Sequence, residues 1–247
     1  MSGGSLVVFL VSAFGAEVIG TMAGFGAATV LTPIASLFLD IKTAVAVVAC
    51  FHLFGNASRL WFFGRSINWT IVRSFGLAAV LFSFAGAQAA ARLPSNQVRL
   101  LLGGFLVVYA LLEACRLTAV HVPATNATLL VGGTASGFIA GLLGTGGAIR
   151  SVCLLAFGLQ KDLYIGTSAV IALVVDATRL PVYVSRQFIP PALGPVILSL
   201  TVVAFGGAWL GRRLVQRISP ARFQRFVLLM LILMGLKLVI DGLRGVA

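Results

Sequence analysis

Long apolar segments follow one another along almost the whole chain, and they constrain the fold more than any other feature. Runs of about 20 residues, the length that crosses a hydrocarbon core about 30 Å thick, recur between residues 5 and 243. The 247 residues are 60% hydrophobic and 10% charged, whereas a soluble domain is about 25% charged. Because lipid offers no partner to an open strand, each crossing segment should be helical. The sequence therefore predicts an all-α polytopic membrane protein.

The charge balance is strongly basic, with 18 Lys and Arg residues against 6 Asp and Glu residues and a net charge of +12. In a soluble protein this balance would suggest nucleic-acid binding. Here most basic residues stand at the ends of the apolar runs, where they set topology and contact lipid headgroups. We therefore expect membrane lipids, and no nucleic acid, as partners.

The sequence contains an internal repeat, because four blocks of the first half recur in the same order in the second half. The matching blocks are 20–24 with 137–141, 56–60 with 176–180, 84–93 with 205–214, and 94–99 with 220–225. The repeat predicts one membrane domain built from a first half (residues 1–118), a linker (119–126) and a second half (127–247).

Each half should contain four apolar elements, at 5–39, 43–64, 69–91 and 98–117, and at 127–158, 163–185, 191–214 and 222–243. A straight helix over either opening element would reach about 45–50 Å, so these elements must break. Each is then one broken crossing helix, which makes the halves parallel, or a hairpin of two pieces of about 16–17 residues, which makes them inverted. We favour the inverted hairpin because such pieces are short for full spans.

Glycines mark both breaks. Paired breaks at matching places in two repeats are typical of a transporter's binding site, because each break frees backbone N–H groups at the positive end of a half-helix. Such a site favours an anion. Alternatively, the glycines only permit close helix packing. The candidate substrate-binding glycines are Gly24, Gly26, Gly144, Gly146 and Gly147.

Arg150 follows the second break by about one turn, in an otherwise apolar run whose counterpart in the first half is near Val30 or Leu31. A permanent cation inside a membrane protein needs a counter-charge, water or a bound anion. Arg150 either grips an oxyanion with its planar donor fork or pairs with Asp176 or Glu17.

Two further pairs have i, i+3 spacing, which places both members on one helix face. They are Asn56 with Arg59, and Asp176 with Arg179, at matching places in the two halves. Both pairs could line the binding site. The alternative is that the arginines extend to the membrane interface. Asp176 needs Arg150 or Arg179 as a partner, or else holds a proton.

Three titratable residues inside the membrane segments could carry protons during transport: Glu17, His52 and Asp176. For Glu17 the alternative is structural ion pairing, and for His52 it is a hydrogen-bonded packing role. The sequence holds no HExxH motif, and the glycine run at 144–147 lacks the Lys and the Ser/Thr of a nucleotide loop. We therefore expect no enzyme activity, metal or cofactor.

With these motifs the sequence resembles the TauE/SafE sulfite exporter family, also called the toluene sulfonate uptake permease family. The resemblance implies a duplicated helical transporter of sulfur-containing anions such as sulfite or organosulfonates. Two departures stand out. The family usually has a third Gly and then a Pro along this motif, whereas here Ala148 follows Gly147 and Cys153 occupies the place that Pro33 has in the first half; and Arg150 is not part of the family's general motif. The motifs that carry the resemblance are the Gly-x-x-Ala-Gly openings at 20–24 and 137–141, the Gly-Thr-Gly-Gly at 144–147, and the Gly-Thr-Ser at 166–168.

Taken together, these features predict a secondary transporter of a small anionic substrate in the bacterial cytoplasmic membrane, working by alternating access with proton coupling. Two alternatives stay open: a passive anion channel, and a non-transporting membrane subunit that assembles a partner. A homodimer is also left open, as are the anion itself and the direction of transport.

Overall fold

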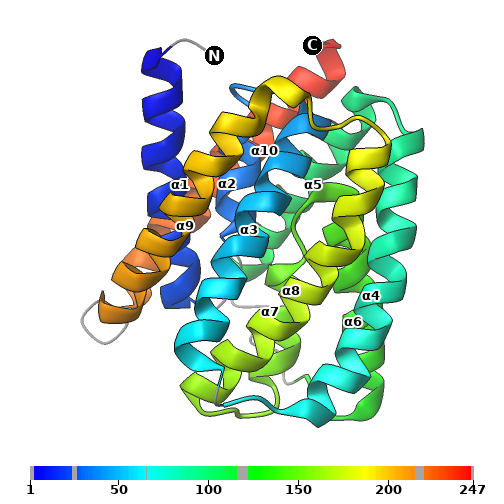
Figure 1. Ribbon diagram of the computed structural model, residues 1–247. Helices are drawn as coiled ribbons and strands as arrows, with labels where there is room; N and C mark the ends of the chain where they lie inside the picture. The colour runs from blue at the N-terminus through cyan, green and yellow to red at the C-terminus, as the bar shows by residue number, and fades with distance from the viewer. Residues whose placement is uncertain (1–2, 24–26, 65, 116–121, 215–219, 246–247) are drawn as a thin grey trace.

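The computed structural model describes residues 3–23, 27–64, 66–115, 122–214 and 220–245 of the chain, and in this part it is helical with no strand (Figure 1). Its α-helices are α1 (Gly3–Ala23), α2 (Ala28–Ala35), α3 (Ile41–Phe63), α4 (Trp69–Arg92), α5 (Ser95–Ala114), α6 (Asn126–Leu143), α7 (Gly147–Leu155), α8 (Lys161–Ser185), α9 (Gly194–Leu214) and α10 (Pro220–Arg244). A short 3₁₀ helix, η2 (Pro191–Leu193), precedes α9.

Seven helices of the described part are long and apolar enough to cross a membrane: α1, α3, α4, α5, α6, α8, and α9 extended by η2. The prediction of an all-α, multi-pass membrane protein is therefore confirmed. Figure 1 shows the pair α1 and α9 at one side, the pair α4 and α6 at the other, and α3 with α8 between them. The outer helices expose apolar side chains, as lipid-facing helices must.

The first opening element folds back on itself. Gly20, near the end of α1, lies against Ala27, because a Cβ added to Gly20 would stand 2.5 Å from the Ala27 backbone nitrogen. Further along, the ring of Phe9 in α1 lies 5.9 Å from the ring of Phe38, which follows α2. Since the end of α1 contacts the residue just before α2, and an early residue of α1 contacts one just after α2, α2 runs antiparallel to α1.

The second opening element folds back in the same way. Ser136 in α6 donates a hydrogen bond of 2.8 Å to the carbonyl oxygen of Gly146, at the start of α7. One turn earlier in α6, Gly132 faces Cys153, near the end of α7. The chain thus turns back between α6 and α7, and the two helices form a hairpin.

The hairpin arms differ in length from the expected 16–17 residues each. They have 21 and 8 residues in the first hairpin, and 18 and 9 in the second. The expectation was wrong because it counted apolar turns as helix: residues 36–38 and 156–158 form turns, the latter ending at Gly158 with φ of 58°. Apolar composition alone does not separate an apolar turn from a helix end.

The central helices α3 and α8 are antiparallel. Lys42, at the start of α3, lies 5.3 Å from the ring of Phe188, just beyond the end of α8. At the other end, a Cβ added to Gly166 in early α8 would stand 2.9 Å from the carbonyl oxygen of Phe63, the last residue of α3. The middle of α3 therefore faces the middle of α8 inside the bundle.

Glycines spaced four residues apart on α6 let it pack directly on the backbone of α4. Added Cβ atoms at Gly133, Gly137 and Gly141 would stand 2.4, 2.1 and 2.0 Å from the carbonyl oxygens of Phe75, Ala79 and Ser83, respectively. Only hydrogen fits in these positions. Gly137 and Gly141, which belong to the repeated Gly motif, therefore permit close helix packing, as the packing interpretation expects.

Candidate functional site

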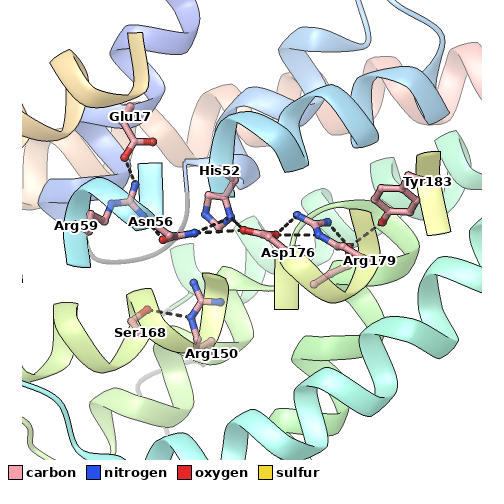
Figure 2. A network of polar contacts seen from close by, with 10 residues as sticks. Glu17, His52, Asn56, Arg59, Arg150, Ser168, Asp176, Arg179 and Tyr183 are labelled. Atoms are coloured by element: carbon pink, nitrogen blue, oxygen red, sulfur yellow. Dashed lines mark hydrogen bonds and ion pairs between the residues drawn. The ribbon is translucent and has the colours of Figure 1, made fainter. Parts of the chain in front are cut away.

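A row of buried polar side chains crosses the middle of the bundle (Figure 2). Helices α1, α3 and α8 contribute its members, and α7 adds one more residue beside it. All are nine-tenths or more buried, and most are charged or titratable: Glu17, His52, Asn56, Arg59, Arg150, Ser168, Asp176, Arg179 and Tyr183. So many polar groups in an apolar bundle are costly unless each has a defined partner or task.

The first end of the row is organised by Arg59 on α3. Its three guanidinium nitrogens donate to three different side chains: Nη2 to Glu17 Oε1 at 2.5 Å, Nε to Thr21 Oγ1 at 3.1 Å, and Nη1 to Asn56 Oδ1 at 3.0 Å. Glu17 and Thr21 belong to α1, so Arg59 ties the first hairpin to α3. The guanidinium stays inside the bundle and does not extend to the membrane interface, contrary to that alternative.

The other end is organised by Arg179 on α8. Nε and Nη2 donate to Asp176 Oδ1 at 2.9 and 2.6 Å, and Nη1 donates to the carbonyl oxygen of Ala140 at 2.5 Å. Tyr183 donates to the carbonyl of Gly141 at 2.5 Å. These carbonyls lie at the negative C-terminal end of α6, where a cation is favourable. Arg179 thus ties the second hairpin to α8, and Asp176 has Arg179 rather than Arg150 as its partner.

His52 and Asn56 join the two ends of the row. His52 Nδ1 lies 2.8 Å from Asp176 Oδ2, and Asn56 Nδ2 donates to the same oxygen at 3.3 Å. These contacts connect α3 with α8 at mid-helix. His52 is only 4% exposed, yet its Nε2 has no hydrogen-bond partner among the residues that the structure describes. A buried nitrogen without a partner costs about 1–3 kcal/mol.

Arg150 differs from the other two arginines. It is 4% exposed, and its Nε donates to Ser168 Oγ at 2.9 Å. All six acidic residues of the chain lie in the described part, and none of their carboxylates is within 4.0 Å of Arg150. In Figure 2 its guanidinium points toward the His52–Asp176 row. Neither alternative partner expected from the sequence, Asp176 or Glu17, is bonded to it.

The second glycine break lies beside this arginine. Gly144 ends α6 with φ of 80°, a left-handed conformation that favours glycine, and α7 begins at Gly147 after Gly146 as its N-cap. Arg150 therefore sits one turn into α7: its own N–H donates to the carbonyl of Gly146 at 3.1 Å, whereas the N–H groups of the residues before it lie in the first turn, where intrahelical partners are missing. Gly24 and Gly26, the corresponding glycines of the first break, lie outside the described residues.

The two hairpins touch at their breaks. Thr29, in the first turn of α2, and Thr145, just before α7, share a hydrogen bond of 2.7 Å between their hydroxyls. Thr32 in α2 is fully buried, its hydroxyl has no hydrogen-bond partner within the described ranges, and it lies 3.5 Å from where a Cβ on Gly144 would stand. The N-terminal ends of α2 and α7 therefore meet next to the polar row.

Helical hairpins that meet at their tips, beside buried charged side chains at the middle of a multi-pass bundle, define the protein as a polytopic membrane protein of the transporter class. Comparison with family models makes this specific: the "Sulfite exporter TauE/SafE" model matches residues 8–238. The chain belongs to this family, which is a family of membrane transporters and not of enzymes. Searches of curated proteins and of solved structures find no match.

Sequence reasoning missed several members of the site. Thr29 and Thr145 give no signal of their own, because a threonine in an apolar run is common in membrane helices. Tyr183 and Thr21 bind groups on other helices, which spacing within one helix does not reveal. Ser168 lies in the Gly-Thr-Ser motif at 166–168, so this motif supplies the hydroxyl that orients Arg150.

Proposed function

We propose that the protein is a secondary transporter of a small sulfur-containing or organic oxyanion, such as sulfite or an organosulfonate, in the bacterial cytoplasmic membrane. One observation carries the proposal: Arg150 is a buried cation, held through Nε by a neutral hydroxyl, with no carboxylate within 4.0 Å. A guanidinium in that position has donors available for a planar, two-point contact with an oxyanion. The family to which the chain belongs supports an anion as the cargo.

The neighbouring breaks support the same site. At the starts of α2 and α7, the backbone N–H groups and the positive ends of the helix dipoles face the region between the hairpins. At the second break, Gly144 faces Thr32 of α2, whose hydroxyl has no partner among the residues that the structure describes, whereas Gly146 packs against Ser136 of α6 and Gly147 begins α7. We place the anion between the Arg150 guanidinium and these helix ends.

Arg59 and Arg179 have a different part in this proposal. Each already donates through all three guanidinium nitrogens to protein groups, so each holds a hairpin in place rather than gripping the anion. Asn56 and Asp176 line the site from α3 and α8. Glu17, His52 and Asp176 are the candidates for moving a proton with the cargo, since they are the titratable members of the row other than Tyr183.

We further propose that the two halves are inverted repeats. By rocking about the α3–α8 contact, they would open the anion site first to one side of the membrane and then to the other. The matching helices α3 and α8 are antiparallel, and the packing partners match as well: α4 packs on α6 as α9 packs on α1, while α5 packs on α10. An inverted duplication of this kind provides two related conformations, one open to each side.

Flux measurements in proteoliposomes test the proposal. Losing charge-assisted hydrogen bonds of about 1.5–3 kcal/mol should weaken the apparent affinity of Arg150→Ala for sulfite or an organosulfonate by about 10- to 150-fold. Arg73→Ala is the matched control, because Arg73 is exposed in the first turns of α4. Wild-type affinity and flux in Arg150→Ala would show that the anion is not held there.

A second measurement separates a transporter from a channel. Proteoliposomes with an imposed proton gradient should accumulate the anion above its outside concentration, and a protonophore should abolish the accumulation. Equilibration without accumulation, unaffected by the protonophore, would mean passive conduction.

A further inference from the structure

The buried charges of the site do not cancel. Three guanidinium groups, those of Arg59, Arg150 and Arg179, face two carboxylates, those of Glu17 and Asp176. With a neutral His52, the sum is 3 − 2 = +1. Removing charges from water costs several kcal/mol per ion, and a net charge buried in a membrane protein has no surrounding water to offset it.

No other acidic group corrects this sum. The remaining four carboxylates lie away from the row: Asp40 caps α3 at its start, Glu113 is near the end of α5, Asp162 is in the first turn of α8, and Asp241 pairs with Lys237 in α10. A bound anion of charge −1 therefore makes the site electrically neutral. A dianion would leave it at −1 unless a proton came with it.

His52 is the group placed to take that proton. Asp176 is bonded to Arg179 through Oδ1 and so is a carboxylate that only accepts hydrogen bonds, which means that the 2.8 Å contact needs the hydrogen on His52 Nδ1. Nε2 then carries the free lone pair of the neutral ring, buried and without a partner in the described part of the chain. Protonation there adds one positive charge and one N–H donor.

Glu17 also has a buried oxygen, Oε2, without a partner among the described residues, but it is less suited to this task. A Cβ on Gly55 would stand 2.6 Å from Oε2, so the backbone of α3 covers this atom. Its other oxygen is bonded to Arg59. In Figure 2 the Arg150 guanidinium points toward the His52–Asp176 contact, whereas Glu17 lies at the far end of the row, beyond Arg59.

The charged groups facing His52 come from three helices. Asp176 faces it from α8, Arg150 from α7, and Arg59 from its own helix. Helix α2, which also packs on α3, has no titratable side chain. The charge state of His52 is therefore set by one carboxylate, two guanidinium groups and the bound anion.

From this arrangement we infer that the site binds a net charge of −1: a monoanion such as a sulfonate alone, or an oxyanion of charge −2 together with one proton on His52 Nε2. This inference rests on the proposed anion site. The balance is simple. A monoanion takes the site from +1 to 0, while a dianion and one proton from solution reach the same total. No bond of the cargo is made or broken.

Isothermal titration calorimetry on the purified full chain tests the inference, with methanesulfonate as the monoanion and sulfate as the dianion. Titrations in buffers of different ionisation enthalpy give the number of protons taken up per bound anion. We expect about zero for methanesulfonate and about one for sulfate near pH 7. For His52→Gln, we expect no proton uptake with sulfate and at least about a tenfold fall in the sulfate to methanesulfonate affinity ratio.

The outcomes separate the inference from the proposed function. If wild-type protein binds both anions with the same proton count, or binds methanesulfonate but never sulfate, the inference is wrong while the anion site stands. Uptake of one proton by His52→Gln would also overturn it, and Glu17→Gln would then show whether Glu17 takes the proton. If Arg150→Ala binds both anions as the wild type does, the site itself is misplaced.

Discussion

Asp176 holds together the centre of the buried row, so neutralising it should destabilise the fold strongly. Its Oδ1 accepts two hydrogen bonds from Arg179, and its Oδ2 accepts from His52 and Asn56, while the residue is 1% exposed. In Asp176→Asn the side chain keeps its shape but loses its charge, and one acceptor becomes an NH₂ group facing other donors. Arg179 is left as an unpaired buried cation.

The size of the effect follows from this loss. Breaking a buried ion pair by removing one partner costs about 3–5 kcal/mol of unfolding free energy. For a chain of about 150–250 residues each kcal/mol shifts the melting temperature by about 2–4 °C, so Asp176→Asn should melt about 6–20 °C below wild type. Thermal unfolding followed by tryptophan fluorescence in one detergent measures the shift.

Two controls make this prediction sharp. Asp162→Asn changes an exposed carboxylate in the first turn of the same helix, worth about 0.3–1 kcal/mol through the helix dipole, and should shift the melting temperature by no more than about 4 °C. In the double variant Asp176→Asn with Arg179→Gln no unpaired charge remains, so it should be more stable than the sum of the two single changes. A melting temperature of Asp176→Asn within about 2 °C of wild type, or strict additivity in the double variant, would refute this reasoning.

Three further changes have defined outcomes. Gly141→Ala places a Cβ 2.0 Å from a carbonyl oxygen of α4 and should destabilise by at least about 1–3 kcal/mol, whereas Gly104→Ala meets open space and should not lower the melting temperature. Thr145→Val removes the hydroxyl that meets Thr29 at 2.7 Å, so it should cost about 1–3 kcal/mol of unfolding free energy and change the transport rate more than Gly104→Ala does. Arg59→Lys keeps the charge but loses the three-point contact, and should lower the melting temperature although net charge is unchanged; an unchanged value would mean that only charge matters there.

Much of the architecture could be predicted from the sequence, because lipid leaves few options for a long apolar segment. The expected element at 69–91 is α4, residues 69–92, and the expected element at 163–185 is α8, residues 161–185. The second break also lies at the glycines that predicted it, since Gly144 adopts a positive φ that other residues rarely adopt. These features are local, and local sequence carries them.

The pairing of side chains inside the bundle could not be predicted in the same way. Spacing places Asp176 and Arg179 on one face of a helix, but it does not show which of two arginines Asp176 will meet. The link from His52 to Asp176 depends on the antiparallel contact of α3 and α8. Spacing within one helix likewise gave no sign that Arg179 would bind the carbonyl of Ala140 across the bundle. Contacts of this kind follow from tertiary packing, which sets which faces meet.

The position of a bound sulfonate relative to Arg150 tests the central claim most directly. A structure determined with 2-bromoethanesulfonate, located by the anomalous signal of its bromine, would give this position without relying on flux. We predict sulfonate oxygens about 2.7–2.9 Å from the Arg150 guanidinium, between the starts of α2 and α7. A sulfonate bound elsewhere in the bundle, with Arg150 still bonded only to Ser168, would contradict the account.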